Sequence, residues 1–287
     1  MRSEEVAVVG YGLFVPGFAG VPAWTKGVYD AAQSAPLALS IPARQRRRTS
    51  TLTKALADAY AEALAMANLA APEVASVFAS ALGEASTMLG LLEQLWSEEG
   101  LLSPQRFVTS VHNAAAGVVS IAGGNQGFST SLGADYDTPA MALAEGIGLV
   151  LAEGAAVVVC CGDEGISGDL VPAGKGWELM AAAIALVPSE RAPTAAPRLR
   201  LEEGPVYGEA DDADSSERWA PLALSHELAS NPCVGLLELV DALARDKQGS
   251  VRLDRGQGAG YVAHLHRGKG SELRAGDPGS AERGVAP

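Results

Sequence analysis

Continuous apolar stretches alternate with stretches of helical periodicity along most of the chain. Residues 6–9 form an apolar run that ends at glycines, which is typical of a buried strand leaving a sheet through a turn. Apolar residues recur at helical spacing over 52–67, directly after three hydroxyl residues suited to an N-cap. The same patterns predict further strands at 74–82, 127–133, 155–161, 180–187 and 259–265, and further helices at 86–96, 114–121, 138–151 and 234–243.

The order of these elements predicts the fold class. Strands that alternate with helices favour an α/β protein whose mostly parallel sheet is covered by helices on both faces. Residues 1–266 are predicted to form one domain. Within it, residues 188–220 are rich in Pro, Asp and Glu and are expected to be an acidic surface excursion. The Gly-rich and charged residues 267–287 are expected to be a disordered tail.

Composition and charge narrow the possible partners. The 287 residues are 48% hydrophobic and carry a net charge of −13, which disfavours nucleic acid because phosphate binding needs a clustered basic face. The only such cluster is Arg44 with Arg46, Arg47 and Arg48. Its simplest interpretation is a solvated loop or an ion-paired cap. A docking patch for an acidic carrier protein is the alternative, since a basic patch would steer such a partner.

The cysteines and the apolar segments indicate where the protein acts. Three cysteines offer neither a disulfide framework nor a metal-binding spacing, which favours a reducing cytoplasm. Cys160 and Cys161 end an apolar strand and are expected to be inert core residues, whereas Cys233 precedes a helix, a place that could lower a thiol pKa. No signal peptide and no window of the ~18 apolar residues needed to span a membrane is found, so no membrane span is predicted.

No cofactor or metal is predicted either. The glycines at 10, 12 and 17 are spaced too widely for a dinucleotide-binding turn, and Pro16 interrupts them. His264 and His266 share one strand face but lack a third ligand, and His226 is expected at the surface. His112, beside Asn113 in a polar run, is either a hydrogen-bonded structural residue or a functional one.

Several stretches together resemble the N-terminal region of β-ketoacyl synthases. They are residues 6–12 (VAVVGYG), 78–84 (FASALGE), 110–117 (SVHNAAAG), 120–132 (SIAGGNQGFSTSL) and 161–164 (CGDE). The likeness covers roughly residues 5–190 and is similar above all to short ketosynthase-like proteins of aryl polyene and related pigment clusters. It implies half of a thiolase-like fold whose C-terminal half is truncated.

The resemblance also implies a lost nucleophile. In active ketosynthases a cysteine stands in the turn after the short strand, where the start of a helix favours its thiolate. Here the turn at 133–139 reads GADYDTP, and Tyr136 lies nearest the vacated position. A phenol of pKa ~10 is a poor acyl acceptor at neutral pH, and the acids Asp135 and Asp137 are expected to raise that pKa further. The two polar groups that the family takes from its C-terminal half to stabilise the reacting anions are not found.

These features lead to three hypotheses. The first is a non-catalytic subunit similar to the chain-length factors of type II polyketide systems, which pairs with a full-length ketosynthase as a heterodimer or a homodimer and meets an acyl carrier protein through that complex. In it Phe128, Ser129, Thr130, Ser131 and Leu132 form the interface strand, and His112 and Asn113 face the partner's tunnel. The second is an acyltransferase or thioester hydrolase acting through Tyr136, Ser131 or Cys160, with His112 as the base. The third is a stand-alone acyl-binding protein.

Overall fold

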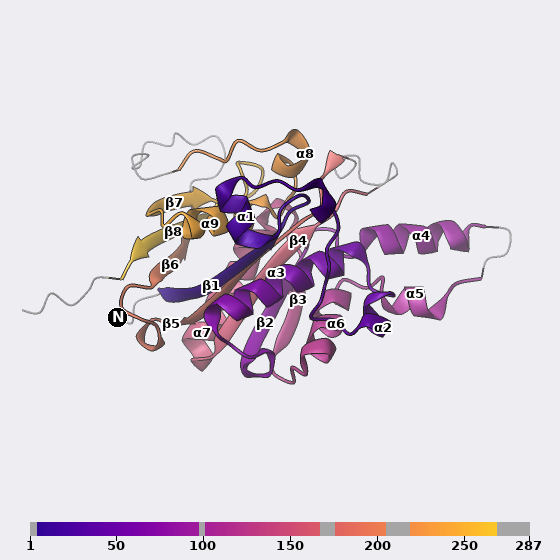
Figure 1. Cartoon of the computed structure of the whole chain (residues 1–287), viewed down its shortest axis with the longest axis horizontal. Helices are drawn as coiled ribbons and strands as arrows, with labels where there is room; N and C mark the ends of the chain where they lie inside the picture. Colours follow the sequence, from indigo (N-terminus) through magenta and orange to yellow (C-terminus); the bar gives the residue numbers. More distant parts are fainter. Residues whose placement is uncertain (1–4, 98–100, 167–175, 205–218, 269–287) are drawn as a thin grey trace, which may run out of the picture.

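One mixed sheet of eight strands organises the molecule (Figure 1). The structure is a computed structural model, and it describes residues 5–97, 101–166, 176–204 and 219–268. The strands lie in the order β3-β2-β4-β5-β1-β6-β8-β7. Their bounds are β1 Val6–Phe14, β2 Val74–Ala79, β3 Ser129–Leu132, β4 Ala156–Asp163, β5 Met180–Pro188, β6 Pro197–Glu202, β7 Gly249–Arg252 and β8 Val262–Arg267.

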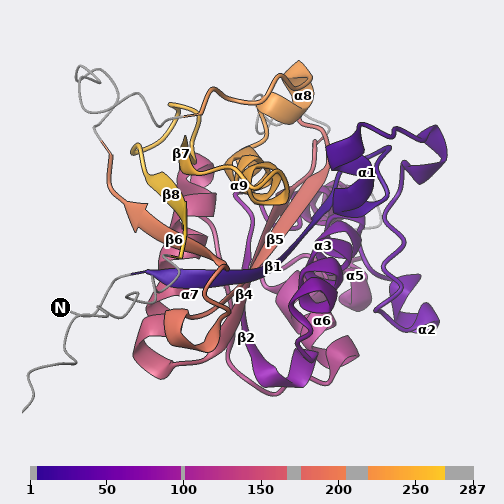
Figure 2. The ribbon, with the colours of Figure 1, turned by 60° about the vertical axis from the view of Figure 1, so that its left-hand side comes forward.

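Helices cover both faces of the sheet, as the sequence predicts. Side chains of α3 and α6 belong to the core on one face and those of α7 and α9 to the core on the other. In Figure 2, α3 and α6 accordingly lie on the opposite side of the strands from α7. The helices are α1 Gly20–Lys26, α2 Ala43–Arg46, α3 Thr51–Ala67, α4 Ala85–Leu95, α5 Pro104–Val108, α6 Ala114–Gly123, α7 Thr138–Glu153, α8 His226–Ala229 and α9 Val234–Ala244.

Strand direction differs from the prediction of a mostly parallel sheet. Only β2 with β3 and β2 with β4 pair in parallel, whereas β4–β5, β5–β1, β1–β6, β6–β8 and β8–β7 are antiparallel. A strand that is buried on both faces is a continuous apolar run whether it is parallel or antiparallel to the strands beside it. The periodicity of the sequence therefore does not reveal the direction of neighbouring strands.

The chain after β5 completes the sheet, which corrects the prediction of an acidic surface excursion. Strand β6 lies inside the range 188–220, and its Leu199 is fully buried. It pairs with β1 through Val6 and Ala7 and with β8 along its whole length. Residues 205–218 and the predicted tail from 269 onwards lie outside the described residues. Strand β7, which the sequence did not predict, pairs with β8.

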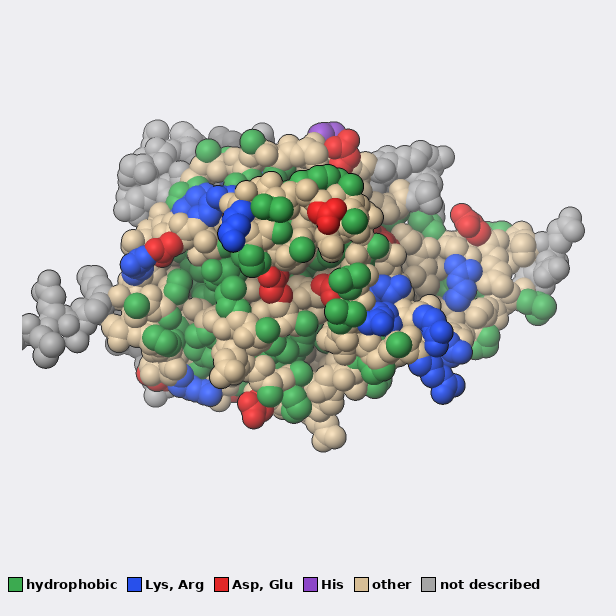
Figure 3. All heavy atoms as spheres, viewed as in Figure 1, with side chains coloured by type: hydrophobic (Ala, Val, Ile, Leu, Met, Phe, Trp, Pro, Cys, Tyr) green, Lys and Arg blue, Asp and Glu red, His purple; other side chains and the backbone are tan. Residues whose placement is uncertain are grey.

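Helices α4 and α5 extend from the body of the molecule at one end (Figure 1). Lys and Arg side chains gather at this end, over α2 and α5 (Figure 3). No helix within the described ranges is long and apolar enough to cross a membrane.

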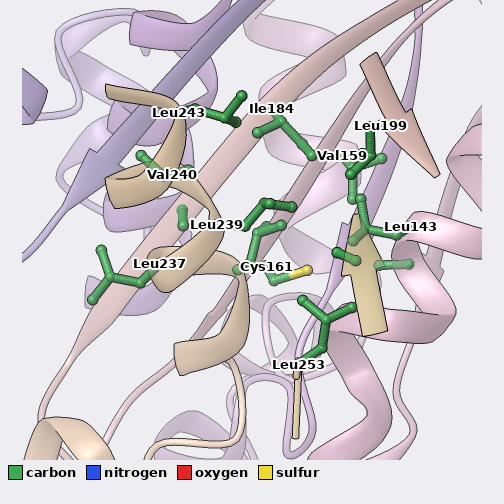
Figure 4. Close-up of a cluster of buried hydrophobic side chains, with 14 of the residues drawn as sticks. Leu143, Val159, Cys161, Ile184, Leu199, Leu237, Leu239, Val240, Leu243 and Leu253 are labelled. Atoms are coloured by element: carbon green, nitrogen blue, oxygen red, sulfur yellow. The ribbon is translucent and has the colours of Figure 1, made fainter. Parts of the chain in front are cut away.

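The larger core packs α7 and α9 against the sheet (Figure 4). Leu143 of α7 and Leu239 of α9 are fully buried there, as is Ile184 of β5. On the other face, α3 approaches β1 closely because of Gly12, where a Cβ atom would lie 2.3 Å from the carbonyl oxygen of Ala59. Glycine therefore lets the helix backbone rest directly on the strand.

Candidate functional site at the turn before helix α7

The turn between β3 and α7 is a tightly held structure. Asp135 adopts a left-handed backbone conformation with φ of 50°, which is uncommon for a residue other than glycine. The hydroxyl of Thr138, fully buried, accepts a hydrogen bond from the Ala134 amide at 3.0 Å and donates one to the Asp135 carbonyl at 2.7 Å. Thr138 thus fixes the path of the backbone just before Tyr136.

Tyr136 is partly buried in this turn. Burial raises the pKa of its phenol, and the neighbouring charge of Asp135 raises the pKa further. The expected effect of Asp135 is therefore confirmed. The carboxylate of Asp137 points elsewhere, to the backbone amide of Ala259, whose nitrogen lies 2.9 Å from Oδ1. The phenol remains protonated at neutral pH and is a weak nucleophile.

A glycine-rich loop at 254–260 lies against the same turn. The buried carboxylate of Asp254 accepts hydrogen bonds from the amides of Gly256, Gly258 and Gly260 at 2.8, 2.9 and 2.9 Å. At Gly258 an added Cβ would lie 2.3 Å from Oδ1 of Asp137. Sequence reasoning missed this contact, although the alternating glycines after an aspartate were a signal of a loop that wraps around a carboxylate.

His112 lies beside the start of the turn. Its Nε2 is 2.7 Å from the carbonyl oxygen of Ser80, and because a carbonyl only accepts, Nε2 carries the proton. A Cβ at Gly133 would lie 3.0 Å from this nitrogen, so glycine is needed for the approach. The structure therefore brings His112 next to the vacated nucleophile turn.

The buried carboxyl group of Asp163 holds the end of β2, where the carbonyl of Ser80 contacts His112. Asp163, 1% exposed, accepts hydrogen bonds from the Ser80 hydroxyl at 2.6 Å and the Ala81 amide at 2.8 Å. Burial raises its pKa despite these donors. Asn231 donates to the carbonyl oxygens of Asp163 and Glu178, which ties the start of the α9 segment to the end of β4. The sequence did not reveal this network.

The predicted interface residues form the edge of the sheet. Strand β3 pairs with β2 on one side only, and Phe128, just before it, is 51% exposed. A hollow of about 480 Å³ lies between β3 and α6, and Asn113 lines it together with Ser129, Thr130 and Ser131. The buried hydroxyl of Ser131 has no hydrogen-bond partner among the described residues.

All three cysteines lie in the core. Each is fully buried, which confirms the interpretation of Cys160 and Cys161 as core residues. The expectation that the start of a helix could lower the pKa of Cys233 is wrong, because burial and the charge of Asp163 raise that pKa. Among the described residues no cluster of three potential metal ligands occurs. His264 and His266 lie beside Glu202 and Glu5 respectively.

The fold and the sequence can be compared with those of known proteins. Residues 22–234 match the family model of the β-ketoacyl synthase N-terminal domain, and the chain belongs to this family. The molecule has the thiolase-like fold of ketosynthases. No protein of curated function matches the sequence.

Three similar solved structures cover nearly the whole chain. One is a chain from the ketosynthase ApeO in complex with its chain length factor ApeC from Xenorhabdus doucetiae, with a TM-score of 0.64, 19% identity, and coverage of 91% of this chain and 99% of that one. A second is from the ishigamide ketosynthase/chain length factor, with a TM-score of 0.63, 15% identity and coverage of 92% and 99%. The third is from AntDE:AntF, a type II carrier protein with its ketosynthase, with a TM-score of 0.64, 13% identity and coverage of 92% and 99%.

Proposed function

We propose that this protein is a non-catalytic subunit, similar to a chain-length factor, that pairs with a complete ketosynthase. The observation that carries the proposal is the turn at Tyr136, which holds a phenol where active members of the family hold a thiol. All three cysteines of the sequence are fully buried away from this turn. A thiol with a raised pKa and no access to solvent cannot receive an acyl group from a thioester.

The similar structures support a pairing role. Two of them are described as a ketosynthase together with its chain length factor, and the third as a ketosynthase with a carrier protein. The chain matched in each is covered to 99%, so those chains are close to this one in length. In our proposal the complex extends a polyketide or aryl polyene chain carried by an acyl carrier protein, and this subunit bounds the pocket for that chain.

The exposed edge of the sheet supports the location of the interface. An unpaired edge strand tends to pair with another chain, and β3 has neither Lys nor Pro to prevent this. Phe128, directly before this strand, is 51% exposed. Apolar surface of this kind marks interaction sites. We therefore propose that Phe128–Leu132 pair antiparallel with the partner's strand, with His112 and Asn113 facing its tunnel.

A catalytic role has less support. Acyl transfer through Tyr136 or Ser131 needs a base within hydrogen-bond reach, and Nε2 of the candidate base His112 is held by the Ser80 carbonyl. The thiol of Cys160 donates to the Leu56 carbonyl at 3.4 Å inside the core. A stand-alone acyl-binding protein is the remaining alternative, and it would act without a ketosynthase.

Co-expression with a complete ketosynthase from the same organism tests the proposal. We expect the two chains to co-purify in equal amounts and the complex to elongate acyl chains. Incubation of each subunit with a labelled acyl thioester should label the ketosynthase and leave this chain unlabelled. Covalent labelling of this chain would favour the enzyme hypothesis, and a monomer that ignores the ketosynthase would overturn the pairing role.

A further inference from the structure

An arginine cluster lies at the end of the molecule where α2 meets α5. Arg47 and Arg48 follow α2, and Arg106 extends from α5 against Gly90 of α4. Within the part of the chain that the structure describes, the guanidinium groups of Arg47 and Arg48 form no hydrogen bond or ion pair. Unpaired arginines are notable in a chain of net charge −13. Figure 3 shows basic side chains gathered over this end.

These three arginines line a polar hollow of about 350 Å³. Apart from Glu164, every other residue of its wall is a serine or a threonine. Burial raises the pKa of Glu164, although a hydrogen bond with Ser86, another residue of the wall, lowers it. The guanidinium groups are the main donors that the hollow offers, because the hydroxyls of Thr49, Ser50 and Thr109 already donate to the Gln45 carbonyl, the Glu84 carboxyl and the Arg106 carbonyl.

An apolar groove of about 690 Å³ adjoins the polar hollow. Both are lined by Arg48, Thr49 and Thr109, so the two hollows lie side by side. The groove runs between α2, α5 and α6, and its apolar walls include Val108 and Ile121, which are 69% and 76% exposed. Covering such surface is favourable by about 25 cal/mol for each Å² removed from water.

We propose that the two hollows form one binding site for a single-chain amphiphile with a phosphate ester head. The phosphate lies between Arg47, Arg48 and Arg106, and the alkyl or acyl chain lies in the groove against Val108 and Ile121. A phosphate group presents several acceptor oxygens and matches the planar donor fork of arginine, so it can engage more than one guanidinium at once. Neither the turn at Tyr136 nor strand β3 contributes to the site, so the inference goes beyond the proposed function.

Calorimetric titration of the purified full-length chain with decyl phosphate, below its micellar concentration, tests the site. We expect one molecule to bind per chain, at least tenfold more tightly than either decanol or inorganic phosphate, because each of these fills only one of the two hollows. The double variant Arg47→Gln with Arg48→Gln, and separately Ile121→Asn, should each weaken binding tenfold or more.

Matched variants control for charge and surface changes elsewhere. Arg191→Gln removes an arginine that instead donates to the Gly154 carbonyl, and Met66→Asn removes an exposed apolar side chain of α3; both should bind like the parent protein. Val108→Asn provides a second groove variant if Ile121→Asn unfolds, as followed by thermal unfolding.

Unchanged affinity in the arginine and groove variants would overturn the inference. Equal affinity for decanol would also overturn it, because the arginines would then have no role. Binding only to vesicles that contain phosphatidic acid, with no binding of monomeric decyl phosphate, would indicate adsorption to a charged membrane rather than this site. Co-purification of the double arginine variant with the ketosynthase is measured in parallel, so that failure of the site and failure of the pairing role are distinguished.

Discussion

At the scale of single residues, Tyr136 decides what the vacated turn can do. Restoring a thiol with Tyr136→Cys is not expected to restore condensation. The glycine loop held by Asp137 still covers the turn, and a site without oxyanion donors lacks a contribution of roughly 3 kcal/mol or more to transition-state stabilisation. Release of ketoacyl product from malonyl and acyl thioesters measures the effect. Sustained turnover by this variant would show that the described residues include an oxyanion site that we have not identified.

The environment of a second residue, Glu84, leads to a prediction about how the stability of the protein depends on pH. The carboxyl group is 3% exposed, and burial raises its pKa above the ordinary 4.5 in spite of hydrogen bonds from Thr53 and Ser50. The folded protein therefore holds this proton more tightly than the unfolded chain does. Its contribution to the free energy of unfolding is fully present below pH 4.5 and is lost as the pH rises through the raised pKa.

Glu84→Gln should therefore make the free energy of unfolding fall less steeply as the pH rises above 4.5. Urea unfolding at a series of pH values measures the slope. Some dependence should remain, because burial also raises the pKa of Asp163 and Glu164. Glu93→Gln, at an exposed position of α4, controls for the loss of one negative charge. An identical slope in Glu84→Gln and in the parent protein would contradict the raised pKa of Glu84.

At the scale of elements, β3 offers a direct test of the proposed pairing. The carbonyl oxygens of Phe128 and Leu132 accept hydrogen bonds from the amides of Ser76 in β2 and of Ser80 directly after it, so alternate residues of the β3 segment turn their backbone groups to β2. Ser131 belongs to the other set of alternate residues, so its backbone amide faces the open edge of the sheet. Ser131→Pro removes that donor and leaves the ladder with β2 intact.

We expect Ser131→Pro to weaken the complex with the ketosynthase at least tenfold, as measured by sedimentation of the mixed proteins. Ser131→Ala is the matched control, since it removes the same hydroxyl but keeps the amide, and it should sediment like the parent complex. Circular dichroism and thermal unfolding of the isolated variants check that the fold survives. A complex of full strength with Ser131→Pro would place the interface on another surface.

At the scale of the whole molecule, the isolated protein should not form ketoacyl product from malonyl and acyl thioesters. The physical reason is that no thiol of the chain reaches solvent, since all three cysteines are fully buried. Mass spectrometry of the reaction mixture measures the product. A catalytic amount of ketoacyl product from the pure chain, free of any ketosynthase, would refute the non-catalytic role.

The sequence by itself determined the features that depend on neighbouring residues. Most strands predicted from apolar runs lie within a few residues of their observed bounds, for example β4 at 155–161 against Ala156–Asp163, whereas β1 continues beyond its predicted residues 6–9 to Phe14. Ser50 caps α3 by accepting from the Thr53 amide at 3.0 Å, as its residue type predicted. The absence of cysteine from the turn at Tyr136 is likewise a property of the sequence alone. These features follow from periodicity and residue chemistry over a few positions.

Only the tertiary structure decided which distant segments meet. The bond from Ala259 to Asp137 joins residues 122 positions apart, and no local pattern encodes it. The antiparallel direction of β5 and the recruitment of β6 from an acidic stretch depend on which strand offers a free edge. Arg106 likewise joins Arg47 and Arg48 in one hollow only because α5 folds back toward α2. Such contacts are selected by the packing of the whole chain, since periodicity reports only which face of an element is buried and not what covers it.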